Sequence, residues 1–257
     1  MWRSFEPEPG KWYRWDLHGA AAWLKKETRP GGFLWHTAFE TVSLEKAWTA
    51  AANRGGPRKE EAPEGLSCTV SCGGGPAVRL RPCPGTKPCL AILGDKVNLL
   101  PGAEARFTLY LPPAFRFETG DDCLDSVLPF IHSEAWFGDA MLGLLCLYLP
   151  PPLVFPAPGP PGPAAFIRCD LSVRNRSKTA ADISRQLIYT ESLGIYEAEG
   201  GLCSGMIAVE ILPGGDLKIT AAPPEGKHAR IGPVPRNGVG DILIRRGTDF
   251  IKDILRT

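Results

Sequence analysis

The clearest pattern along the chain is a two-residue alternation of apolar and polar side chains. Residues 105–111 place Phe107, Leu109 and Leu111 on one face of an extended chain. Residues 167–174 repeat the alternation with Ile, Cys, Leu and Val at every second position. Because successive side chains of a strand point to opposite faces, this period predicts half-buried β-strands.

Turn residues separate these runs at short intervals. Residues 206–212 and 217–221 flank the sequence Pro-Gly-Gly-Asp, which is typical of a β-hairpin. Residues 11–17, 20–27 and 32–39 form a similar set near the start, with Arg-Pro-Gly-Gly as a turn between the last two. The pattern therefore predicts hairpins at both ends of the chain.

Helical signals are few and short. A helix over residues 44–53 is favoured because Ser43 suits an N-cap, and the alternative is a strand that ends near Trp48. A terminal helix is predicted over residues 249–255, where Thr248 is the candidate cap.

These elements predict an all-β protein with antiparallel β-sandwich architecture, two packed β lobes and the short C-terminal helix. The predicted lobes are a tryptophan-rich one at residues 1–120 and a sandwich lobe at residues 121–257. Residues 53–65 are polar and are expected to form an exposed loop. Residues 150–163 contain eight prolines and are expected to form a long excursion between strands.

Composition indicates which partners and which cellular compartment to expect. The chain has 257 residues and a formal net charge of +1, which does not favour a nucleic-acid partner. The start of the chain lacks the apolar core of a secretory signal, and residues 141–155 are too short for a membrane span. We therefore expect a soluble, cytoplasmic protein whose eight cysteines are free thiols.

Some of these cysteines form a candidate zinc motif. Cys68 and Cys72 are followed by Cys83 and Cys89 among glycines and prolines. Three and five residues separate the members of the two pairs, whereas zinc knuckles usually have two, so free thiols are the favoured interpretation.

Carboxylates and a histidine gather in a second candidate site. Asp121, Asp122 and Asp125 precede His132 and Glu134 within a short stretch, and Asp139 follows them. Oxygen and imidazole groups of this kind bind divalent cations or act as a general acid and base. The alternative, which we favour, is a solvated acidic loop, because no known metal-binding loop matches it.

Tryptophans in the first third form a third candidate. Trp12, Trp15, Trp23 and Trp35 are interleaved with basic residues, so exposed rings there would stack on sugars or bases or anchor a protein. Packing in a small β core is the favoured interpretation, because each ring covers a large apolar area.

No motif for phosphate-binding loops, dinucleotide binding, serine hydrolases or zinc proteases is present. The leading hypothesis is therefore a non-enzymatic binding or interaction protein, with a protein partner or a homo-oligomer and no cofactor. The alternative is a metal-binding protein or metal-dependent enzyme that uses a divalent metal at the 121–139 region. A carbohydrate-binding module is a weaker alternative.

Several short segments resemble one known family. They are Leu-Leu-Pro-Gly at 99–102 with the strand at 107–112, residues 136–146, and the strand and turn at 171–177. Over about residues 95–222 the chain resembles the domain of unknown function 432 family. That family is best represented among archaea and has no established activity, so the resemblance implies a β-rich fold and no particular chemistry.

Overall fold

The computed structural model describes residues 2–50, 55–138, 143–149, 166–198, 201–226, 228–232 and 242–244. Nearly all of the described secondary structure is β-strand, in several antiparallel sheets, which confirms the predicted all-β class. The chain forms two compact units, each assembled from segments that are separate in the sequence. Unit 1 holds the described residues up to Cys83 and Pro112–Ile131. Unit 2 holds Pro84–Leu111 and the described parts of His132–Gly162 and Phe166–Thr257.

Proline marks two of the places where the described chain passes from one unit to the other. The described chain crosses after Cys83, where Pro84 follows, and after Leu111, where Pro112 follows. Since proline cannot donate a hydrogen bond to a β ladder, it favours the end of a strand at these points. The sequence predicted two continuous lobes that divide at residue 120. That division remains a prediction.

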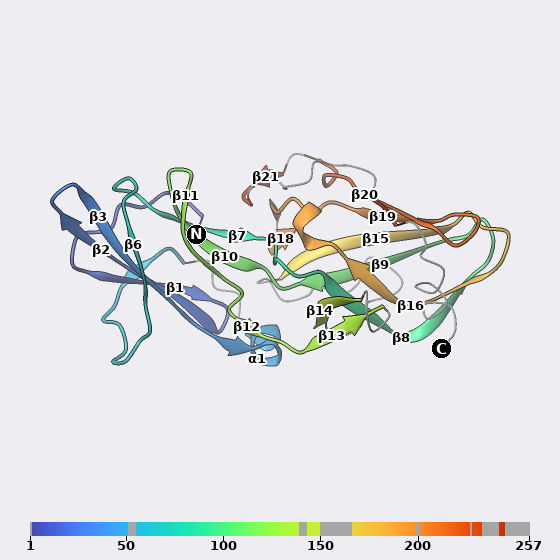
Figure 1. The fold of residues 1–257 in the computed structure, drawn as a ribbon, viewed down its shortest axis with the longest axis horizontal. Helices are drawn as coiled ribbons and strands as arrows, with labels where there is room; N and C mark the ends of the chain where they lie inside the picture. The colour runs from blue at the N-terminus through green and yellow to red at the C-terminus, as the bar shows by residue number, and fades with distance from the viewer. Residues whose placement is uncertain are drawn as a thin grey trace. The chain divides into compact units, whose positions relative to one another are not determined.

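The first sheet of unit 1 is built from the predicted N-terminal hairpins. Its order is β5 (Arg58–Lys59), β1 (Trp12–Leu17), β2 (Ala20–Arg29), β3 (Gly32–Glu40) and β6 (Thr69–Cys72), all antiparallel (Figure 1). The β1–β2 turn is formed by His18 and Gly19, whose φ values of 53° and 93° suit a type I′ turn. Pro30 and Gly31 form the β2–β3 turn, where Gly31 supplies a φ of 90° that a side chain would strain.

A second sheet of unit 1 joins strands from two distant segments. Its order is β11 (Asp122–Val127), β10 (Ala114–Thr119) and β7 (Arg79–Cys83), again antiparallel. A short parallel pair, β12 (Phe130–Ile131) and β4 (Val42–Ser43), leads into the helix α1 (Leu44–Thr49). Ser43 Oγ accepts a hydrogen bond from Lys46 N at 3.3 Å, which confirms the predicted N-cap, although the helix ends before residue 53.

The described residues of unit 2 form two sheets. The first has the order β13 (Glu134–Phe137), β14 (Leu144–Leu149), β8 (Cys89–Leu99) and β16 (Ala181–Ile188). The second has the order β21 (Ala229–Arg230), β17 (Tyr196–Ala198), β18 (Gly201–Cys203), β15 (Ile167–Asn175), β19 (Ile207–Ile211), β20 (Leu217–Ala221) and β22 (Ile242–Ile244), and β9 (Glu104–Leu111) pairs with β15. A 3₁₀ turn, η1, spans Thr190–Ser192.

Not every strand pair is antiparallel. β15 pairs in parallel with both β18 and β19, and β14 pairs in parallel with β8. Side-chain alternation is the same in both orientations, so the sequence pattern does not distinguish them. The predicted hairpin of β19 and β20 is confirmed, because residues 212–216 connect these strands and the strands pair antiparallel.

Asn175 organises the connection from β15 to β16. Its side chain is fully buried, and its Nδ2 donates to the carbonyl oxygens of Leu99 and Thr179, both at 2.8 Å. Its Oδ1 accepts hydrogen bonds from the backbone N and the hydroxyl of Ser177, at 2.9 and 2.7 Å. Each polar atom of this amide is satisfied, so a buried polar group stabilises the turn.

Two segments that were expected to be loops contain strands. Short β5 lies within 53–65, and β11 begins at Asp122 within the acidic stretch that follows Gly120. The C-terminal helix expected at 249–255 and the proline-rich 150–163 lie outside the described residues. Among the described residues, no helix has the length and apolar composition needed to cross a lipid bilayer.

Candidate functional site

Most of the candidate tryptophans lie inside unit 1. Trp15, Trp23 and Trp35 are each 1% exposed or less, so their ring faces are not presented to a ligand. Trp12 is half-buried, with the ammonium of Lys25 over its ring at 5.3 Å and His36 at its edge. Three of the four rings thus have a packing role, and the binding hypothesis stays a prediction for Trp12.

The first sheet is covered on both faces, which explains this burial. On one face, Trp15 makes edge contacts with Phe5 and with Phe117 of β10, at centroid distances of 6.1 and 5.3 Å. On the other face, Trp23 packs beneath Leu66 and its neighbours, which belong to the segment between β5 and β6. The alternation predicted the strands correctly, but it does not show that a loop covers the second face.

The acidic candidate residues are divided between the two units. Asp121, Asp122 and Asp125 belong to unit 1, and His132 and Glu134 belong to unit 2. Asp121 and Asp122 are exposed near the turn between β10 and β11. In the described part of the chain, no three His, Cys, Asp or Glu side chains gather at metal-binding distance. The metal hypothesis stays a prediction that no observed cluster favours, and Asp139 lies outside the described residues.

Two of these carboxylates already have protein partners. Asp125 Oδ2 accepts a hydrogen bond from Thr37 Oγ1 of β3 at 2.8 Å, and its Oδ1 accepts one from the backbone N of Ser126. Glu134 forms an ion pair with Lys87, and the hydrogen bond from that ammonium lowers the pKa of Glu134. Both side chains therefore hold strands or loops of their own unit in place.

All eight cysteines are free thiols, and they differ sharply in their environment. Burial raises the pKa of Cys83 to about 11, and it raises the pKa values of Cys89 and Cys169 to about 12. Cys72 and Cys123 are exposed instead. Since the thiolate is the reactive form, the buried thiols behave as small apolar side chains.

We expect this difference to appear in thiol labelling with a disulfide reagent at pH 8. Cys72 and Cys123 should react first. Cys83, Cys89 and Cys169 should react at least about a hundredfold more slowly, because only a small fraction of each buried thiol is ionised at pH 8. A Cys72→Ser, Cys123→Ser double variant should lose the fast phase, which stopped-flow absorbance measures. Fast labelling of a buried thiol in folded protein would contradict the assignment.

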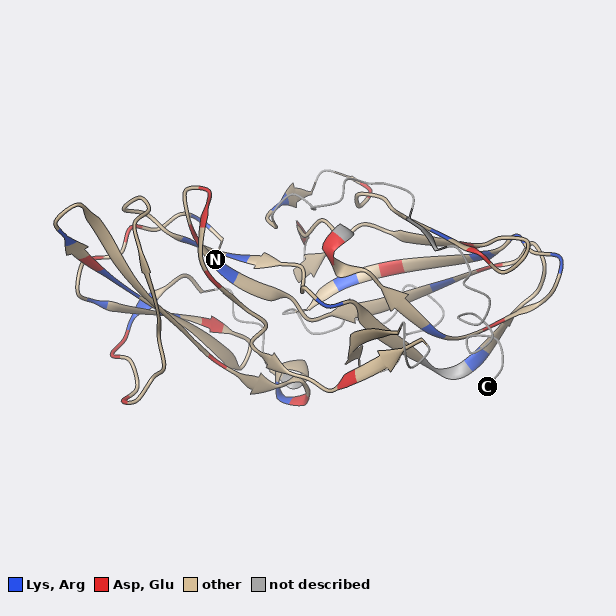
Figure 2. Cartoon of the chain, in the orientation of Figure 1, with Lys and Arg blue, Asp and Glu red and all other residues tan. Residues whose placement is uncertain are grey.

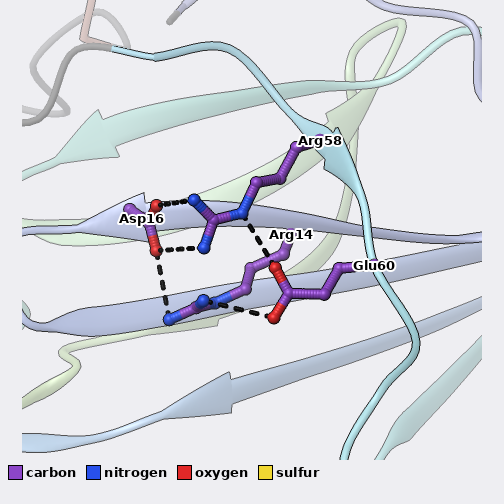
Figure 3. A network of polar contacts seen from close by, with 4 residues as sticks. All are labelled: Arg14, Asp16, Arg58 and Glu60. Carbon is purple, nitrogen blue, oxygen red and sulfur yellow. Dashed lines mark hydrogen bonds and ion pairs between the residues drawn. The ribbon is translucent and has the colours of Figure 1, made fainter.

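A closed polar network lies on the first sheet of unit 1 (Figure 3). Arg14 contacts Asp16 Oδ1 at 3.1 Å and Glu60 Oε1 at 3.3 Å. Arg58 contacts Asp16 Oδ2 at 2.9 Å and Glu60 Oε2 at 2.8 Å. The hydrogen bond from Arg58 lowers the pKa of Glu60. Two guanidinium groups balance two carboxylates, so this network ties β5 to β1 and carries no net charge.

An exposed apolar pair on unit 2 is the candidate surface that the residue patterns did not single out. Trp136 of β13 lies opposite Leu145 of β14 in the register, and their exposed fractions are 51% and 43%. The neighbouring Ala135 and Phe137 pack inward with Cys146, so strand alternation places Trp136 on the outer face. We call Trp136 and Leu145 the outer apolar pair.

β13 is also an edge strand. It pairs with β14 on one side, and no described strand pairs with its other side (Figure 1). A signal was present in the sequence, since Trp136 is the single tryptophan outside the first third of the chain. Trp136 is a large aromatic side chain on the outer face of an edge strand, so it does not pack in the core and is available for contact with another molecule.

A family model described as a protein of unknown function, DUF432, matches residues 1–245. The chain belongs to this family. The match extends well beyond residues 95–222 and includes the tryptophan-rich start and the region from Cys68 to Cys89. DUF432 therefore spans segments of both units. Neither a curated protein nor a solved structure shows significant similarity to the chain.

Proposed function

We propose that this DUF432 protein is a non-enzymatic interaction protein that binds a protein partner along β13. The observation that carries the proposal is the outer apolar pair: Trp136 lies on β13, whose second edge no described strand pairs with, and Leu145 lies beside it on β14. Tryptophan is the residue type most enriched among side chains that dominate binding energy at protein interfaces. An open strand edge offers unpaired backbone groups to an extended segment of another chain.

The expected partner segment is an extended strand with an apolar side chain opposite Trp136. Backbone hydrogen bonds along β13 would supply register, and contact with Trp136 and Leu145 would supply most of the affinity. Next to the pair, Glu134 of β13 forms an ion pair with Lys87, which lies in the segment before β8, and the two side chains form a polar border. A polar rim around an apolar centre is the usual arrangement of protein interfaces.

Site-specific photo-crosslinking tests this function. A photoreactive residue at position 136 should yield a discrete adduct in cells, whereas the same residue at Leu100, which is 62% exposed in the same unit, should not. With the purified partner, Trp136→Ala should weaken binding by about tenfold or more, and Leu100→Ala by less than about twofold. Circular dichroism should show that both variants keep the fold.

The outcomes separate the possible partners. Crosslinks to an extended segment of a different protein support the proposal. Crosslinks to position 136 of a second copy would overturn a different protein as the partner and show that β13 forms a homo-oligomer contact. Equal adduct yields at positions 136 and 100, or equal affinities of wild type and Trp136→Ala for the purified partner, would overturn the proposal.

The proposal includes a cytoplasmic location. Cys89, Cys146 and Cys169 pack as free thiols inside unit 2, which suits a compartment that keeps cysteines reduced. Fractionation of the source cells tests this location directly.

A further inference from the structure

Three arginines surround one buried carboxylate on the second sheet of unit 1. The register pairs Arg79 with Glu118 and Arg81 with Arg116, so all four side chains lie on the same face of β7 and β10. The distances to Glu118 are 3.4 Å from Arg79 Nε, 3.1 Å from Arg81 Nη1 and 2.6 Å from Arg116 Nε. We call Arg79, Arg81 and Arg116 the arginine cluster.

The cluster carries more positive charge than Glu118 neutralises. Three guanidinium groups, which stay protonated at all working pH values, face one carboxylate and leave an excess of two positive charges. The network in Figure 3 contains equal numbers of arginines and acids and has no such excess. Both signs of charge are distributed over the strands of unit 1 (Figure 2), so the local imbalance does not reflect a basic unit as a whole.

On the far side of β7, Phe5 bridges Val78, and the adjacent Glu6 contacts Lys26 at 3.6 Å. On the near side, β11 places no second carboxylate opposite the cluster. β11 contributes Ser126 opposite Arg116 and Cys123 opposite Glu118, and neither is acidic. Asp125 lies opposite Phe117, and its Oδ2 accepts a hydrogen bond from Thr37. Asp122, opposite Thr119, lies one position out of phase with Glu118, and it is exposed with Asp121 near the turn.

The arginines remain accessible while the carboxylate does not. The side chain of Glu118 is 4% exposed, whereas those of Arg79, Arg81 and Arg116 are 39%, 20% and 24% exposed. Arg116 Nε is buried and contacts Glu118 without the alignment of a hydrogen bond. Glu118 thus lies beneath the cluster and orders it, the three arginine side chains reach solvent in part, and Arg79 Nη2 donates a hydrogen bond to the Gly120 carbonyl oxygen at 3.3 Å.

We propose that the arginine cluster binds a phosphate dianion, either inorganic phosphate or the terminal group of a phosphate monoester. A phosphate group carries about −1.5 to −2 charges at pH 7, which matches the excess of the cluster. Planar guanidinium groups donate paired hydrogen bonds to phosphate oxygens, and Glu118 fixes their positions in advance. The hydroxyl of Ser126, on the same face, is a further candidate donor.

Isothermal titration at constant ionic strength tests this site with three probes: inorganic phosphate, O-phosphoserine and chloride. Wild type should bind a phosphate probe at one saturable site and should not bind chloride. Arg79→Gln, which changes the most exposed arginine of the cluster, should weaken phosphate binding by about tenfold or more. Arg58→Gln, which removes an equal charge from the balanced network, should change it by less than about twofold.

The probes distinguish the two sources of phosphate. Equal or tighter binding of inorganic phosphate assigns the free ion, and tighter binding of O-phosphoserine assigns a monoester. If Arg79→Gln does not fold, Arg79→Lys keeps the charge without the paired donors and should still bind phosphate more weakly than wild type. No saturable binding of either phosphate probe to wild type, or equal affinities for wild type and the folded cluster variant, would overturn the site.

Discussion

Replacing Trp15 with alanine is expected to lower the free energy of unfolding of unit 1 by about 3–5 kcal/mol. Trp15 is 1% exposed and contacts Phe5 and Phe117, which come from different segments of the chain. The substitution removes a large apolar surface and leaves a cavity that neighbouring rings fill only in part. Because six of the seven tryptophans precede Cys83, fluorescence in a urea titration reports mainly on unit 1.

Trp12→Ala is the matched control on the same strand. Its ring lies on the opposite face and is half-buried, so the loss should be less than half of that for Trp15→Ala. Equal losses for the two variants, or a Trp15→Ala protein within about 1 kcal/mol of wild type, would show that Trp15 is not a central core residue. Either result would reopen the ligand-binding interpretation of the tryptophans.

Glu118→Ala is expected to destabilise unit 1 by about 3–5 kcal/mol, a similar loss with a different cause. The variant leaves three arginines close together without the carboxylate that they share. Removing one member of a buried ion-paired group leaves the other charges uncompensated, which costs more than the lost pair itself contributes. Urea unfolding should show a lower midpoint with an unchanged slope.

Glu60→Ala provides the control for Glu118→Ala. Glu60 also contacts two arginines, but its side chain is 37% exposed, so solvent screens its charge and the loss should be small beside that of Glu118→Ala. A Glu118→Ala protein that loses no more than Glu60→Ala would show that the arginine cluster does not depend on Glu118. Glu118→Gln, which keeps the size of the side chain, separates the loss of charge from the loss of packing.

The candidate sites show why side-chain function was harder to predict than strands. The metal hypothesis relied on closeness in sequence. Within unit 1, however, Asp125 accepts a hydrogen bond from Thr37 of a different sheet, and within unit 2 Glu134 forms an ion pair with Lys87. The arginine cluster shows the opposite case, because its members are distant in the sequence and close in the structure. Arg79 and Arg116 are 37 positions apart (116 − 79), and the pairing of β7 with β10 places both on Glu118.

The sequence by itself determined the features that depend on neighbours along the chain. The alternation at 105–111, the Pro30-Gly31 turn and the Ser43 cap each involve only a few consecutive residues, and each corresponds to an observed element. Local backbone geometry restricts such segments strongly, so short patterns are sufficient to predict them.

Only the tertiary structure decided which faces are covered and which strands are neighbours. The parallel pairing of β15 with β19, the covering of Trp23 by a loop and the exposure of Trp136 all depend on contacts between distant segments. A two-residue period gives the same pattern for either strand orientation and for either side of a sheet. The β-rich character of this DUF432 protein was therefore readable from its sequence, whereas the outer apolar pair and the arginine cluster required the assembled sheets.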